Sequence, residues 1–147
     1  LTNWIFRKSS TNSNVNCYEV NNLRLPANAK IGDLELIETI VSYILFVRAK
    51  TDYVPDKLLS AYLEQVIDGL VYELYFPELL KKHSREIIKH MGELPKITIT
   101  QNDRINSNII KKVFDRLNEK EHPVRINLFY MNSIPEIAII EERNENN

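Results

Sequence analysis

The chain has 147 residues, of which 44% are hydrophobic and 27% charged, proportions typical of a folded domain rather than a disordered chain. Nineteen basic and twenty acidic residues give a formal net charge of −1, which excludes a polycation that binds nucleic acid through bulk charge. The three glycines, Gly32, Gly69 and Gly92, lie far apart, so the sequence lacks the glycine-rich loops that hold nucleotide phosphates, dinucleotides and methyl donors. This excludes most nucleotide-dependent enzymes.

The single cysteine, Cys17, allows neither an internal disulfide nor a cysteine zinc site, and it indicates a reducing, cytoplasmic setting. The longest apolar run, residues 44–47, is far shorter than the roughly 20 residues that a membrane-spanning helix needs. The chain begins at Leu1 rather than at methionine and runs at once into Trp4, so we expect it to be a piece of a longer protein.

The start of the chain predicts a small β edge. Polar and apolar side chains alternate over residues 2–8, which is typical of a strand, and residues 9–16 are almost all small and polar, which predicts a loop. A second strand is expected over residues 18–25 and ends at Pro26. Because two strands are too few to be stable alone, we interpret residues 1–30 as the trailing edge of a larger sheet.

The next part of the chain predicts helices. Apolar side chains recur at helical spacing over residues 33–48, on so wide an arc that this helix should be well buried. A second helix is predicted over residues 55–76, with proline in its first turn. A third is predicted over residues 78–91 and is expected to end at Gly92.

The last third of the chain contains both the apolar spacing typical of helices and that typical of strands. Residues 97–100 predict a short strand or an extended link, and apolar spacing predicts a fourth helix over residues 108–118. A short fifth helix is expected from Pro123 to Tyr130, and residues 136–142 (EIAIIEE) predict a closing strand.

Together these elements predict a mainly α (α+β) fold: four to five helices with a small β edge, formed by the N-terminal strands and a closing C-terminal strand. The predicted division places the edge in residues 1–30 and the helical domain in residues 31–147. Charge follows this division, because residues 1–30 carry four basic side chains and one acidic one, whereas residues 31–76 carry three basic and eight acidic ones.

A search for catalytic patterns finds none. His83, Glu86 and His90 fall on one predicted helix face, but no further metal ligands accompany them, so a solvated face is the interpretation. The Asp and Glu-x-Lys pattern of a magnesium-dependent nuclease is absent, and so is the Asn/Asp-Pro-Pro-Tyr/Phe motif of adenine methylation. Cys17 has no histidine nearby that could activate it. The sequence therefore offers no catalytic and no metal-binding residue.

Two other clusters are interpreted as structural. Tyr72, Tyr75 and Phe76 lie among leucines at helical spacing, which favours a place in the core over a binding platform. A basic face is predicted on the third helix, and it is either solvated or in contact with phosphates. Its members are Lys81, Lys82, Arg85 and Lys89.

The polar loop near the N-terminus is the candidate binding site. It begins with two cations, which can hold phosphates, and continues with hydroxyl and amide side chains, which can contact base edges. The candidate DNA-binding residues are Arg7, Lys8, Ser9, Ser10, Thr11, Asn12, Ser13, Asn14 and Asn16.

Three stretches carry a resemblance to a known family. They are residues 6–26 (FRKSSTNSNVNCYEVNNLRLP), residues 62–78 (YLEQVIDGLVYELYFPE) and residues 122–141 (HPVRINLFYMNSIPEIAIIE). In this order they resemble the C-terminal region of fused type II restriction–modification enzymes, which act in bacterial defence. The first stretch looks like the end of a TaqI-like target-recognition domain, and the other two look like segments that follow it.

The resemblance implies that this chain is a non-catalytic part that contributes to DNA target recognition and braces the recognition domain. It implies partners as well: double-stranded DNA and upstream methyltransferase or endonuclease domains, with no membrane. Those upstream domains would use S-adenosylmethionine, and Mg²⁺ where they include a nuclease, whereas this part would need no cofactor. The alternative that the residues leave open is a helical interaction or oligomerisation module that does not touch DNA.

Overall fold

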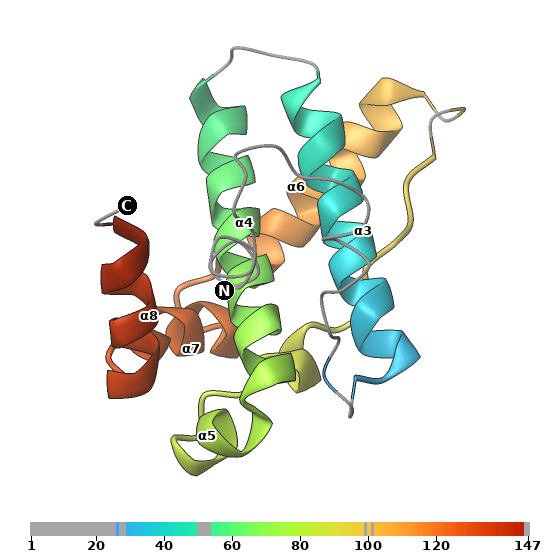
Figure 1. Ribbon diagram of the computed structural model, residues 1–147. Helices are drawn as coiled ribbons and strands as arrows, with labels where there is room; N and C mark the ends of the chain where they lie inside the picture. Colours follow the sequence, from blue (N-terminus) through green and yellow to red (C-terminus); the bar gives the residue numbers. More distant parts are fainter. Residues whose placement is uncertain (1–25, 27–28, 50–53, 99, 101, 146–147) are drawn as a thin grey trace, which may run out of the picture.

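The computed structural model describes residues 26, 29–49, 54–98, 100 and 102–145. Within this part of the chain there are six α-helices and one 3-10 turn (Figure 1). They are α3 (Ile31–Arg48), α4 (Val54–Tyr75), α5 (Pro77–Lys82), the 3-10 turn η1 (Ile88–His90), α6 (Asp103–Leu117), α7 (Pro123–Met131) and α8 (Pro135–Glu145).

Helices α3 and α4 lie side by side and run in opposite directions (Figure 1). Each contributes an apolar face to the shared core, with most side chains three or four residues apart because 3.6 residues make one turn. Tyr72, two residues after Leu70, lies on another face of α4. The buried members are Ile40, Tyr43 and Ile44 from α3 and Leu59, Leu63, Val66, Leu70 and Tyr72 from α4.

The C-terminal helices complete this core. Helix α6 is strongly amphipathic and is capped by Asn102, whose side chain accepts a hydrogen bond from the Arg104 amide (2.8 Å). Helix α7 packs against α4, and α8 follows it after a short turn. Their buried members are Ile110, Val113, Leu117, Val124, Met131 and Ile137, and Ile134 in the turn before α8 is buried as well.

The predicted α+β class is wrong for the part of the chain that the structure describes, which contains helices and no strand. Residues 136–142, predicted as a closing strand, belong to helix α8. The contiguous apolar run 137–140 is compatible with the apolar spacing of a strand and with that of a helix. Pro135 at the start of α8 suits a first helical turn. Residues 97 and 98 form an extended link rather than a strand.

The predicted third helix, residues 78–91, is also wrong in extent. Helix α5 ends at Lys82, and Ser84 adopts a positive φ of 54°, which interrupts the helical path. The chain then continues through η1 to Gly92, whose φ of 62° is the left-handed conformation that glycine adopts easily. The predicted basic face is therefore split between a helix and a loop.

The prediction that the first described helix is well buried is wrong on its outer side. Helix α3 buries Ile40, Tyr43 and Ile44 but leaves Val41 and Leu45 exposed. The strands predicted over residues 2–8 and 18–25 lie outside the described residues, and the domain division at residue 30 stays a prediction. No described helix is both long and apolar enough to span a membrane.

Candidate functional site

A pocket of about 530 Å³ lies between α4, α7 and α8. It has both aromatic and charged walls, and its α4 side chains lie more than 40 residues before the others in the sequence. The lining residues are Tyr62, Gln65, Asp68, Gly69 and Tyr72 of α4, Asn118, Arg125, Leu128, Phe129, Met131 and Asn132 in and around α7, and Glu141 of α8.

Two tyrosines fix the walls of this pocket. The Tyr62 hydroxyl donates to the Leu117 carbonyl at the end of α6 (2.6 Å), and the Tyr62 ring meets Phe114 edge-on at 5.5 Å. The Tyr72 hydroxyl donates to a carboxylate oxygen of Glu141 and so ties α4 to α8. Since both hydroxyls are bonded, the tyrosines serve as ties between helices.

The charged groups of the pocket are arranged asymmetrically. Asp68 lies at its rim, where the adjoining protein atoms and the Glu141 carboxylate raise the pKa of Asp68 above its usual value. The Arg125 guanidinium donates instead to the Asn118 carbonyl (2.7 Å), which holds the connection between α6 and α7. Among the described lining residues, the hydroxyl that is hydrogen-bonded to a carboxylate is that of Tyr72. Burial and the Glu141 carboxylate raise the pKa of Tyr72, so its hydroxyl stays protonated and is a poor nucleophile.

An exposed aromatic pair flanks the pocket. The rings of Phe129 and Tyr130 on α7 meet edge-on at 5.2 Å, and both side chains are exposed. The Arg85 guanidinium lies 4.8 Å from the centre of the Tyr130 ring, a cation–π contact. Arg85 is therefore engaged with α7 and is not a freely solvated cation of a helix face.

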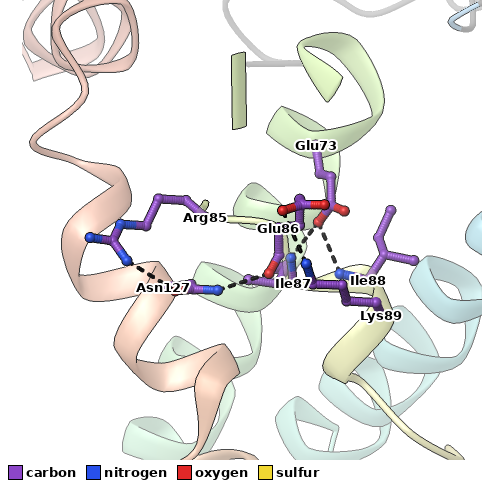
Figure 2. A network of polar contacts seen from close by, with 7 residues as sticks. All are labelled: Glu73, Arg85, Glu86, Ile87, Ile88, Lys89 and Asn127. Atoms are coloured by element: carbon purple, nitrogen blue, oxygen red, sulfur yellow. Dashed lines mark hydrogen bonds and ion pairs between the residues drawn. The ribbon is translucent and has the colours of Figure 1, made fainter. Parts of the chain in front are cut away.

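A polar network holds the connection between α5 and α6 (Figure 2). The Glu73 carboxylate of α4 accepts hydrogen bonds from the backbone amides of Ile87 and Ile88, the latter at 2.9 Å. Asn127 of α7 donates to the Glu86 carbonyl (2.8 Å) and accepts from Arg85 (3.4 Å). Burial raises the pKa of Glu73, although the two amide bonds oppose this. The network satisfies buried polar groups and so has a structural role.

Residues 91–95, which continue the connection toward α6, are held by side chains of α6 and α3. The Arg116 guanidinium donates to the carbonyls of Met91 and Glu93, both at 2.9 Å, and the Tyr43 hydroxyl donates to the Pro95 carbonyl. A Cβ at Gly92 would lie 2.9 Å from Arg116, so the absence of a side chain there allows this close approach.

The structure separates the clusters that the sequence suggested. His83, Glu86 and His90 do not share a helix, and among the described residues no group of three or more His, Cys, Asp and Glu side chains could hold a metal ion. The core interpretation of Tyr72 is confirmed, because its side chain is buried, and Tyr75 and Phe76 pack against the core.

The candidate DNA-binding loop lies outside the described residues. Arg7, Lys8 and residues 9–16 therefore stay predictions.

Sequence reasoning missed the pocket itself. Its α4 wall is the row Tyr62, Gln65, Gly69 and Tyr72, spaced by three, four and three residues beside the apolar stripe. This second row was the available signal. No protein-family profile, curated protein or solved structure matches the chain.

Tyr43 and Tyr72, which are buried, and Tyr62, which is partly buried, predict a loss of stability at high pH. Burial raises the pKa values of Tyr43 and Tyr62 from 10.0 to about 12, and it also raises that of Tyr72. An unfolded chain releases these protons near pH 10, whereas the folded chain keeps them. Their contribution to stability is thus complete below pH 10 and is lost as the pH rises through about 12.

This expectation can be checked by urea unfolding at several pH values between 9 and 12. The free energy of unfolding should fall across the upper part of this range, and Tyr62→Phe should make the fall shallower. An equally steep fall in the wild type and in both Tyr43→Phe and Tyr62→Phe would contradict it.

Proposed function

We propose that this chain is a non-catalytic helical part of a type II restriction–modification enzyme, where it braces the DNA-recognition segment against the catalytic domains. One observation carries the proposal: two of the stretches that resemble this family, residues 62–78 and 122–141, pack directly against each other. The Tyr72 hydroxyl bonds to Glu141, and both stretches line the same pocket. Stretches that recur together in one family are expected to be coupled in space, so this packing supports the resemblance.

Close packing between the same two stretches adds to this support. A Cβ at Gly69 in α4 would clash with Leu128 of α7, so the two helices approach each other closely at this glycine. A glycine inside a helix costs about 1 kcal/mol relative to alanine, and here the close contact accounts for its presence.

In this proposal the N-terminal loop makes the DNA contacts. Arg7 and Lys8 hold phosphates of double-stranded DNA, and the side chains of residues 9–16 approach a groove. The excess of basic side chains in residues 1–30 supports this assignment, whereas the acidic segment 31–76 would repel phosphates.

The chemistry itself belongs to upstream domains. Methyl transfer would use S-adenosylmethionine there, and cleavage, if the parent also cuts, would use Mg²⁺. The helices described here would supply a rigid support in a cytoplasmic enzyme, and no described residue is assigned a catalytic role.

Alanine substitution of Asn12, Asn14 and Asn16 in the full enzyme tests the loop. We expect weaker binding to the cognate site by about tenfold or more, because each lost base contact typically costs about 1–3 kcal/mol. The measurement is a DNA-binding titration at several salt concentrations, with a non-cognate duplex alongside. A reduced ratio of cognate to non-cognate affinity is the supporting result.

Alanines at Glu119, Lys120 and Glu121 are the matched control, since these exposed side chains lie in the turn between α6 and α7. They should leave specificity unchanged. If the asparagine variant keeps both its affinity and its site preference, the loop does not read DNA, and the helical interaction module becomes the better description.

A further inference from the structure

The outer side of α3 carries apolar side chains that the described part of the chain does not cover. Leu45 is 64% exposed and Val41 is 38% exposed, whereas Ile40, Tyr43 and Ile44 on the adjoining face lie in the core. The next exposed position toward the C-terminus is Arg48. When a partner surface removes such exposed apolar groups from water, the free energy of the complex falls.

The spacing of this surface is that of a helix-pairing seam. Glu38, Val41, Leu45 and Arg48 follow one another at intervals of three, four and three residues, and the same alternation reaches back to Leu34 and Ile31. Side chains repeated every 3.5 residues on average keep facing the same partner helix along their length. We call residues 38, 41, 45 and 48 the α3 seam.

The charges at the two ends of the α3 seam define its partner. Glu38 and Arg48 lie five residues before and five residues after position 43, and Val41 and Leu45 lie two residues before and two residues after it. When a second α3 lies antiparallel with its own residue 43 at the same level, each Glu38 meets an Arg48 and each Val41 meets a Leu45. A parallel arrangement would place like charges opposite each other.

We propose that the α3 seam binds a second copy of this chain, in a two-fold antiparallel pairing of the two α3 helices. The apolar pairs Val41–Leu45 form the centre, and the ion pairs Glu38–Arg48 close both ends. Such a self-complementary patch is the arrangement that a two-fold dimer requires. The proposal is independent of the proposed function, because it uses neither the DNA loop nor the family resemblance.

The existing ion pair of Arg48 is compatible with this role. Its guanidinium contacts the Glu64 carboxylate of the same chain, yet the Arg48 side chain remains 61% exposed. A guanidinium has five N–H donors, so it can bind Glu64 and a second carboxylate together.

Sedimentation equilibrium over a concentration series of the complete chain tests the pairing. The wild type should form dimers, and Leu45→Glu should weaken dimerisation by about 30-fold or more, because it places a charge in the apolar centre. The single reversals Glu38→Arg and Arg48→Glu should each weaken it by about fivefold to tenfold. The double reversal, made together with Glu64→Gln so that no carboxylate of the same chain faces position 48, should return the affinity to within about threefold of the wild type.

Two controls isolate the seam. Glu64→Gln removes only the contact within the chain, and Ile105→Glu places a charge at an exposed apolar position on α6, so both should leave the dimer intact. Circular dichroism confirms that each variant is folded. A wild type that stays monomeric, a folded Leu45→Glu variant that dimerises normally, or a double reversal that fails to restore association would each overturn the proposal.

Discussion

Replacing Ile137 with alanine should lower the free energy of unfolding by about 2–4 kcal/mol, whereas Ile139→Ala should change it by less than about 0.5 kcal/mol. The side chain of Ile137 is fully buried, but that of Ile139, two residues later, is 51% exposed. A helix turns by about 200° between these positions, so α8 buries one isoleucine and exposes the other. Truncating the buried one removes core contacts and leaves a cavity, while truncating the exposed one removes little.

Urea unfolding followed by circular dichroism measures both values. The comparison also tests the helix directly, since a strand places residues two apart on the same face and would make the two losses similar. Equal effects of Ile137→Ala and Ile139→Ala would therefore contradict the helical assignment of α8.

Gly69→Val should destabilise the chain by about 1–3 kcal/mol, the usual cost of overpacking a well-filled core. A Cβ at this position would clash with Leu128 of α7 and lie 2.8 Å from the Cδ1 atom of buried Ile87. Valine adds two methyl groups to that Cβ, so α4 and α7 must separate or their side chains must leave their preferred rotamers. The loss should show as a lower thermal midpoint and a lower urea midpoint.

Gly32→Val is the matched control for this substitution. Gly32 lies in the first turn of α3, and a Cβ there would have no atom within 4 Å. Its effect should stay within about 0.5 kcal/mol. A Gly69→Val variant as stable as the Gly32→Val variant would show that the contact between α4 and α7 at Gly69 is not close.

The helices whose apolar spacing is regular were predictable from the sequence. Val113 and Leu117 repeat at an interval of one turn in α6, and Pro123 begins α7 where the sequence placed it. The strand expected at residues 136–142 was wrong, because four consecutive apolar residues satisfy both periods. What decides between them is the packing of Ile137 into the core, a tertiary effect that a local pattern does not contain.

Long-range polar contacts explain the other differences. The predicted helix over residues 78–91 stops at Lys82, and the amides of Ile87 and Ile88 bond to the carboxylate of Glu73 instead. The helix propensity of residues 78–91 does not show that a side chain from α4 accepts hydrogen bonds from these amides. The pocket escaped prediction for the same reason, since its Tyr72–Glu141 tie joins residues 69 positions apart.

The three tyrosine hydroxyls determine how far the chain can be shortened. They join residues separated by 52, 55 and 69 positions, so each ties a helix to a segment far along the chain. Removing the residues from Glu141 onward would deprive Tyr72 of its acceptor and leave a buried hydroxyl without a partner, which costs free energy. A truncated form that keeps the native packing must therefore extend at least through Glu141, although α8 is the last helix described.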